Sequence, residues 1–368
     1  VRSEMTNPDS LRQRLLSIRD SVDRPLFDST LVKWRFEQSK WQKYNDFCIM
    51  EDAPPQVVAL IEERSSELIG VRIETESRRD YIHGTLAAHT LGYLGPIKKT
   101  QLEDELFKEY QPDDRVGQSG LEEVYEAYFR GKDGFQFIEV DAYSRRLGLL
   151  KGMPHVDAIP GNNLVTTLDL RLQKVAEEAF PDTVRGALVA LDPRNGEILA
   201  ILSSPRLDPN IFSLDSLSRK REWQEVALDS TRPLNNRAVV GIYPPASTFK
   251  AFSALAGLRE KAITEKSMPF APCRGAYRFG ARVQRCWKAS GHGKMNVVDA
   301  LRESCNIFFY QLGLKINMEP VNKVARMYGL GEPTGVDLPY EKRGTLIDST
   351  EYERRNKSRG WRWTRGLI

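Results

Sequence analysis

The segment 169–202, DLRLQKVAEEAFPDTVRGALVALDPRNGEILAIL, decides the fold class of this chain. Asp169 predicts the start of a helix that runs to residue 180, because its carboxylate can accept hydrogen bonds from the free N–H groups of a first helical turn. Two apolar runs, 186–191 and 197–202, predict strands, and the Pro-Arg-Asn-Gly turn between them is typical of a hairpin. A helix followed by an antiparallel hairpin predicts an α+β domain in which helices pack on an antiparallel sheet.

The composition of the 368 residues indicates a folded protein of two or three domains. Hydrophobic residues make up 40% of the chain, which is enough to bury a core and excludes a disordered polymer. The 54 Lys and Arg nearly balance the 50 Asp and Glu, so the net charge of +4 gives little support for nucleic-acid binding. Four cysteines are too few for a disulfide-stapled scaffold, and no apolar run is long enough to span a bilayer. No signal peptide is visible and the chain opens on Val1, so we expect a piece of a longer protein.

A domain boundary is expected at Pro160-Gly161-Asn162-Asn163, where the sequence changes character. The residues before it are mixed and charged, whereas the hydrophobic pattern after it is cleaner. We therefore predict one domain over 1–160 and a second over 161–368. Outside the segment that decides the fold, the expected elements are a helix over 120–130 and strands over 71–75, 135–140 and 164–168.

A candidate nucleophile lies in Pro244–Lys250, PPASTFK. The two prolines end an extended approach, and a helix is expected from about Ala246. Ser247 and Lys250 would then share one helix face. A serine hydroxyl needs a neighbouring base to become a good nucleophile, and a lysine can be that base when burial lowers its pKa. The alternative is that the Ser-x-x-Lys pair occurs by chance and has no catalytic role. A Ser-His-Asp triad has few candidate residues, because the chain contains only four histidines.

A second polar pair, Ser304 and Asn306, lies inside the helical pattern of residues 296–314. Residues two apart do not share a face of a regular helix, so both can serve one site only if the helix is broken there. The apolar stripe shifts at this point, which permits a break without proving one. Two polar residues at a helix junction are an equally good interpretation of the spacing.

Ser-x-x-Lys followed by Ser-x-Asn resembles the signature of penicillin-binding proteins and serine β-lactamases. The surrounding sequence is more specific and resembles the elongation-type members of the class B penicillin-binding proteins. The segments that carry this resemblance are LAAHTLGYLG at 86–95, GLEEVYE at 120–126, RGKDG at 130–134 and YGLGEPTGVDLP at 328–339. Together they extend the resemblance over roughly residues 70 to 365.

The resemblance implies a non-catalytic pedestal of the dimerisation type over 1–160. It implies a penicillin-binding/β-lactamase-like transpeptidase domain, C-terminally truncated, over 161–368. The implied activity is that of a serine-type D,D-transpeptidase, of the D-Ala-D-Ala carboxypeptidase class, that cross-links peptidoglycan stem peptides during cell elongation and is a target of β-lactams. The implied roles are acylated nucleophile for Ser247, general base for Lys250, proton relay for Ser304 and substrate-peptide contact for Asn306.

The sequence departs from the family pattern in several places. Ala246 stands where the family usually has Gly, and the early family motif is not clear near residues 17–20. The third signature element, Lys-Ser/Thr-Gly, is absent, and Arg343-Gly344-Thr345 does not replace it. We therefore expect a chain that lacks its membrane anchor and the C-terminal part of its catalytic domain, and that is inactive by itself.

Three cysteines and a histidine predict a structural zinc site: Cys273, Cys286, His292 and Cys305. Two alternatives compete, a Cys273–Cys286 disulfide and a Cys305 that is simply a small buried apolar side chain. The resemblance favours the metal, because elongation-type members look to carry one near Cys-Trp and Gly-His-Gly. A metal there would pin the loop 273–292 onto the helix that carries Ser304.

Two other functional classes remain open. One is a non-catalytic β-lactam sensor or scaffold, and the other is hydrolytic, a D-Ala-D-Ala carboxypeptidase or a β-lactamase. A pedestal of 160 residues argues against a free β-lactamase. The partners that the resemblance implies are stem peptides, β-lactams, a membrane glycan polymerase and elongation-complex scaffold proteins, with no nucleic acid. The implied location is the inner membrane, with the catalytic part in the periplasm.

Overall fold

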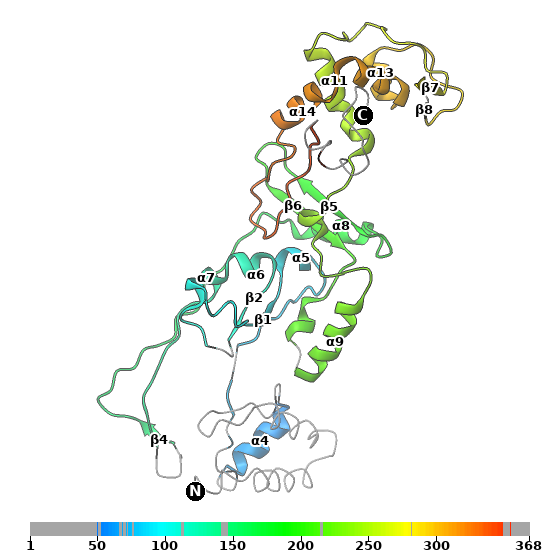
Figure 1. The fold of residues 1–368 in the computed structure, drawn as a ribbon. Helices are drawn as coiled ribbons and strands as arrows, with labels where there is room; N and C mark the ends of the chain where they lie inside the picture. The colour runs from blue at the N-terminus through cyan, green and yellow to red at the C-terminus, as the bar shows by residue number, and fades with distance from the viewer. Residues whose placement is uncertain are drawn as a thin grey trace. The chain divides into compact units, whose positions relative to one another are not determined.

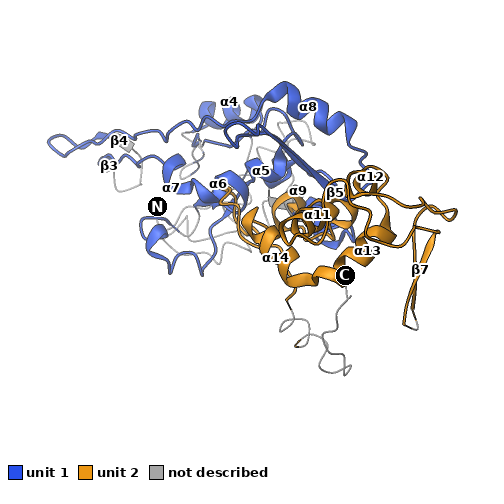
Figure 2. Ribbon diagram, turned by 90° about the horizontal axis from the view of Figure 1, so that it is seen from above, with its two compact units in different colours: residues 1–235 blue, residues 236–368 orange. Residues whose placement is uncertain are grey.

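The computed structural model describes residues 50–348 and Arg354, apart from short gaps at 51–52, 66–67, 69–70, 72, 76, 112–113, 141–145, 214–215 and 281. The chain forms two compact units, residues 1–235 and 236–368 (Figure 2), and each is considered by itself. Helices and small antiparallel sheets alternate along the described residues, which confirms the α+β class. Among these residues, no helix combines the length and apolar character that crossing a bilayer requires.

The first unit begins with a small mixed core (Figure 1). Strands β1 and β2 pair antiparallel beside a cluster of Ile97, Phe107, Tyr110 and Val116. The expected helix over 120–130 is interrupted at Tyr125, and no strand forms in the described part of 71–75. The elements here are α4 (Pro55–Glu63), α5 (Ala88–Leu91), β1 (Leu94–Pro96), η2 (Glu105–Phe107), β2 (Arg115–Gly117), α6 (Gly120–Val124) and α7 (Glu126–Phe129).

A two-stranded arm follows, built from β3 (Ile138–Val140) and β4 (Arg146–Leu149). Isolated bridges continue the pairing between Phe135 and Val156 and between Lys132 and Ile159. The strand expected over 135–140 therefore forms only in its second half. The arm exposes large apolar side chains, including Phe135, Phe137, Leu149, Leu150, Met153, Val156 and Ile159.

The segment 169–202 folds as its sequence predicts. The Asp169 carboxylate accepts hydrogen bonds from the backbone N–H groups of Arg171 and Leu172, at 2.9 and 3.0 Å, and so caps α8 (Leu170–Ala179). Strands β5 (Gly186–Leu191) and β6 (Ile198–Ser204) form the antiparallel hairpin. Helix α8 packs on β6 through Ala176, which lies against Ala200 and Leu202. The strand expected over 164–168 does not form.

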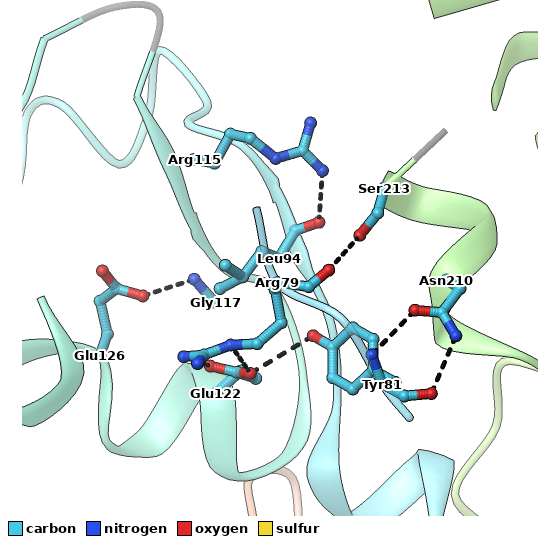
Figure 3. A network of polar contacts seen from close by, with 9 residues as sticks. All are labelled: Arg79, Tyr81, Leu94, Arg115, Gly117, Glu122, Glu126, Asn210 and Ser213. Carbon is cyan, nitrogen blue, oxygen red and sulfur yellow. Dashed lines mark hydrogen bonds and ion pairs between the residues drawn. The ribbon is translucent and has the colours of Figure 1, made fainter. Parts of the chain in front are cut away.

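A polar network joins residues 79–81 of the first unit to residues 210–213, which follow the β5–β6 hairpin (Figure 3). Asn210, in η3 (Pro209–Ser213), accepts a hydrogen bond from the Tyr81 backbone N–H and donates one to the Tyr81 carbonyl, at 2.9 and 3.0 Å. Glu122 accepts from the Tyr81 hydroxyl and pairs with Arg79 at 2.7 Å. Burial raises the pKa of Glu122, against the attraction of Arg79. The division predicted after residue 160 stays a prediction, since residues on both sides of it share this network.

The second unit surrounds an apolar helix. Helix α13 is buried along much of its length, with Ile307 and Leu312 at 1% and 0% exposure. Gly257 of α11 lets Leu312 approach closely, since a Cβ at that position would lie 2.8 Å from Leu312 Cδ1. The elements are α10 (Arg237–Val240), η4 (Ala246–Phe249), α11 (Lys250–Arg259), β7 (Ala276–Phe279), β8 (Arg282–Arg285), α12 (Val297–Arg302), α13 (Asn306–Ile316) and α14 (Met318–Met327); α9 (Ser216–Leu228) belongs to the first unit.

Candidate active site

The Ser247 turn is a short 3-10 helix rather than the first turn of an α-helix. Residues Ala246–Phe249 form η4, and α11 begins at Lys250. Ala246 takes the left-handed conformation, with φ at 49°, which is unfavourable for a residue with a Cβ and explains a preference for Gly there. The turn leaves Ser247 exposed to solvent while Lys250 is half-buried. A substrate can therefore reach the serine from outside while the lysine is held from within.

The four predicted catalytic residues meet around the Lys250 amine. Its Nζ atom lies 3.2 Å from Ser247 Oγ, 2.9 Å from Ser304 Oγ and 2.6 Å from Asn306 Oδ1. The Ser304 hydroxyl also donates to Ser247 Oγ over 3.1 Å. Two hydroxyls that contact each other and one amine form a continuous path along which a proton can move.

A break between two helices brings Ser304 and Asn306 into the same site. Helix α12 ends at Arg302 and α13 begins at Asn306, so the continuous pattern of 296–314 is two helices. Ser304 takes the left-handed conformation, with φ at 48°, and Cys305 is extended. This local strain is of the kind that surrounding structure maintains at functional sites. It also resolves the spacing problem, since the two residues are no longer on one regular helix.

The environment of Lys250 lowers its pKa and so makes the neutral amine more accessible. Burial is the main cause that lowers the pKa of Lys250, while Cys286 and Cys305 act in the opposite direction. The Ser304 backbone carbonyl, 2.9 Å from Nζ, holds the amine in place. A neutral amine so positioned can accept the Ser247 proton.

The three cysteines and His292 form one cluster beside this site. Their ligand atoms all lie within 4.8 Å of one another, and the three cysteines are free thiols in the structure. His292 Nδ1 lies 3.7 Å from Cys273 Sγ and 3.5 Å from Cys286 Sγ. Zn–S bonds of about 2.3 Å and Zn–N bonds of about 2.0 Å in a tetrahedron would separate S and N by about 3.5 Å. The arrangement therefore fits a tetrahedral metal, and it does not contain the Cys273–Cys286 disulfide.

The thiols of the cluster differ in acidity. Burial opposes ionisation of Cys286, but the backbone N–H groups of Lys288, Asn306 and Ile307 together with Cys273 lower its pKa. Burial raises the pKa of Cys305 to about 12. Cys305 is completely buried and lies between Ser304 and Asn306 in the chain. A group that binds the Cys305 thiol would therefore also fix the backbone between the end of α12 and the start of α13.

Two contacts of the site were not predicted from the sequence. The Asn306 side-chain amide donates to the Arg285 carbonyl over 3.4 Å, and Trp287 Nε1 donates to the Glu303 carbonyl over 2.9 Å. Both tie the β7–β8 hairpin to the break between α12 and α13. In the sequence, Trp287 served only as a marker of the metal site, and its partner in the second contact is a backbone oxygen that no motif reveals.

Comparison with known proteins places this geometry in a family. The model of the penicillin-binding protein dimerisation domain matches residues 1–166, and that of the penicillin-binding protein transpeptidase domain matches residues 186–361. The peptidoglycan D,D-transpeptidase MrdA of Acinetobacter baumannii is 36% identical over 304 residues, 83% of this chain and 44% of that protein. MrdA of Escherichia coli K12 is 30% identical over 357 residues, 96% of this chain and 55% of that protein.

The solved structures agree with the sequence relatives. Penicillin-binding protein 2 of Helicobacter pylori, solved in complex with MreC, superposes with a TM-score of 0.79 at 30% identity, over 98% of this chain and 65% of that one. The chain spans about half the length of the curated relatives that it matches. On the strength of both domain matches and these relatives, the chain belongs to the elongation-type class B penicillin-binding proteins.

Proposed function

We propose that the protein to which this chain belongs is a serine-type D,D-transpeptidase that cross-links peptidoglycan stem peptides during cell elongation. The observation that supports it most directly is the Lys250 amine between two hydroxyls, 3.2 Å from Ser247 Oγ and 2.9 Å from Ser304 Oγ. The MrdA relatives, whose name states this activity, give independent support.

The residues suggest the following steps. Neutral Lys250 removes the Ser247 proton as Oγ attacks the carbonyl between the two terminal D-Ala residues, and a C–O bond forms. The tetrahedral intermediate collapses, the C–N bond breaks, and the departing D-Ala amine takes a proton from Lys250 through Ser304. The amine of a second stem peptide then attacks the acyl-enzyme, gives up a proton along the same path and releases Ser247. Asn306 would hold the donor peptide beside the serine.

A product analysis tests this reaction against its alternatives. The full-length protein is incubated with a donor stem peptide ending in D-Ala-D-Ala and an acceptor stem peptide, and the products are separated by mass. We expect a cross-linked dimer and released D-Ala. Release of D-Ala without dimer would instead indicate a carboxypeptidase, and penicillin acylation without any turnover of peptide would indicate a sensor.

We also propose that Cys273, Cys286, His292 and Cys305 hold a structural zinc ion. The fit of the S···N separations to tetrahedral coordination supports this, as does the donor set of three thiols and one imidazole. Four protein ligands would leave no open position for a catalytic water. The ion would fix the hairpin β7–β8 to the start of α13, and the residues of the cluster would thereby position Ser304 and Asn306.

The zinc proposal predicts both a metal content and a matched pair of variants. Purified protein should contain about one zinc per chain, and Cys305→Ser should lower the melting temperature by several degrees or more and slow penicillin acylation. Cys48→Ser, at a cysteine outside the described residues, should change neither. Elemental analysis, thiol counting and thermal unfolding measure these effects. Metal-free protein after expression in zinc-replete medium, or a Cys273–Cys286 disulfide in a mass map, would exclude the site.

We propose that the whole protein is anchored in the inner membrane with this part in the periplasm, and that it works with a membrane glycan polymerase and elongation scaffold proteins. The Helicobacter pylori relative was solved with MreC, which supports a partner of that kind. The exposed apolar side chains of the arm, such as Phe135 and Ile159, offer a surface for such a partner. Co-purification from membranes should recover these partners. Recovery of the full-length protein in the soluble fraction and alone would contradict the proposal.

A further inference from the structure

A strongly basic segment of this chain lies beside the candidate active site. From Lys266 to Val298 the sequence holds seven lysines and arginines and no aspartate or glutamate, a local charge of +7. The whole chain carries +4, so the other 335 residues together carry +4 − 7 = −3. A near-neutral composition therefore conceals a strongly basic segment, whose cations are Lys266, Arg274, Arg278, Arg282, Arg285, Lys288 and Lys294. A second basic segment, 354–368, lies outside the described residues except for Arg354.

The β7–β8 hairpin carries the centre of this charge. Figure 2 shows the β7 ribbon projecting from the rest of its unit. Arg278 pairs with Val283 across the ladder, and Ala276 pairs with Arg285. Residues that pair directly point to the same face, so Arg278 and Arg285 occupy diagonal positions of one face, with Arg282 on the other. All three arginines are exposed. Like charges so placed repel each other and weaken a two-stranded ribbon, which is marginal by itself.

No acidic side chain in the described part of the chain forms an ion pair with these three arginines. On the C-terminal side, the first acidic residues along the chain, Asp299 and Glu303, both pair with Arg302 instead, at 3.0 and 3.2 Å. The repulsion on the hairpin is therefore not offset within the described chain, and the three guanidinium groups remain available to a ligand.

The base of the hairpin connects to the catalytic residues. The Arg285 carbonyl accepts from Asn306, and Trp287, next to the buried Cys286, donates to the Glu303 carbonyl. A peptide that lies against Asn306 would therefore be next to the base of the hairpin. This position distinguishes the hairpin from a basic patch on an unrelated surface.

We propose that the β7–β8 hairpin binds the carboxylates of a peptidoglycan strand and holds that strand beside Ser247. This rests on the transpeptidase function proposed above. Guanidinium groups form two parallel hydrogen bonds with a carboxylate. Diagonal side chains of a ladder are about 7 Å apart, which matches the spacing of about 7 Å between alternate side chains of an extended peptide. The exposed Phe279, Val283 and Trp287 add apolar surface for sugar rings or side-chain stems.

The test compares strand binding with acylation in the full-length protein. Arg278→Gln and Arg285→Gln are made together, because these two diagonal arginines set the spacing proposed for the carboxylates, and the substitution leaves the Arg285 carbonyl in place. We expect affinity for soluble, uncross-linked peptidoglycan fragments to fall about three- to tenfold at low ionic strength, the effect of losing two exposed ion pairs. The wild-type affinity should decline with salt and on amidation of the fragment carboxylates, and both dependences should be weaker in the variant.

A matched control and an independent readout separate the possible failures. Lys98→Gln with Lys99→Gln removes the same charge from an exposed turn of the first unit and should leave fragment binding unchanged. Labelling of Ser247 by a fluorescent penicillin reports on the proposed catalytic function, because that small ligand does not extend along the hairpin. Unchanged fragment binding by the arginine variant, in protein that labels normally, would overturn the hairpin proposal. A variant that loses affinity only for anionic lipid vesicles would also overturn it and assign the hairpin to a membrane surface. Failure of wild-type protein to label would count against the catalytic proposal instead.

Discussion

Replacing Ser247 with alanine in the full-length protein should reduce covalent labelling by a fluorescent penicillin to background, a loss of more than about a thousandfold. The β-lactam carbonyl needs an oxygen nucleophile, and Ser247 Oγ is the exposed hydroxyl that contacts both Lys250 and Ser304. Ser304 is less exposed than Ser247, so a β-lactam carbonyl cannot approach its hydroxyl as freely. The measurement is in-gel fluorescence after a time course, with the labelled peptide identified by mass.

Ser253→Ala provides the matched control. Ser253 lies on α11, the helix that follows the Ser247 turn, and its hydroxyl donates to the Phe249 carbonyl over 3.5 Å. This variant should label like the wild type and should show that a serine-to-alanine change in α11 does not unfold the protein. Equal labelling of the Ser247→Ala and wild-type proteins would remove Ser247 from the mechanism.

Lys250→Met should slow acylation by about a hundredfold to ten-thousandfold, the usual contribution of a general base. Methionine preserves the length and apolar packing of the side chain but has no proton acceptor of comparable strength. Lys250→Arg should not restore the rate, because a guanidinium stays protonated. Stopped-flow or quenched labelling gives the acylation rate constants of the three proteins at one pH.

The pH dependence of the acylation rate tests whether Lys250 acts as a base. Protonated Lys250 cannot accept the serine proton, so acylation should rise with pH as the amine becomes neutral. Because burial lowers the pKa of Lys250, this rise should be centred below the usual value of about 10.4. An arginine variant that acylates at the wild-type rate, or a wild-type rate with no pH dependence, would be inconsistent with a lysine base.

The parts of the fold that were predictable from sequence are those whose signals are local. The cap at Asp169, the helix after it and the hairpin 186–202 depend on neighbouring residues, and the structure confirms them. The strands expected over 71–75 and 164–168 depended on alternation alone, and a strand also needs a partner. In the described residues of both segments no partner strand is present, so the pattern was not sufficient.

The candidate site was likewise predictable from the sequence only in part. The i, i+3 relation of Ser247 and Lys250 was visible in the sequence, even though the turn proved to be a 3-10 helix. The break that unites Ser304 with Asn306 was permitted by the sequence but not determined by it. Its backbone is held by contacts with distant residues, such as the Trp287 bond to the Glu303 carbonyl. Contacts of this kind join a side chain to a backbone atom, so a pattern of residue types cannot predict them.

The hydrogen bonds that join Tyr81 to Asn210, and Ala87 to Glu177, limit how this protein can be recombined with its relatives. In each of these bonds the partner before residue 160 is a backbone atom and the partner after it is a side chain. A chimera joined at residue 160 therefore keeps both bonds wherever its second parent has Glu at position 177 and Asn at position 210, whereas a junction at 235/236 would divide the segment 186–361 that matches the transpeptidase domain. For protein engineering, the identities of these two residues decide which relatives can be joined at residue 160.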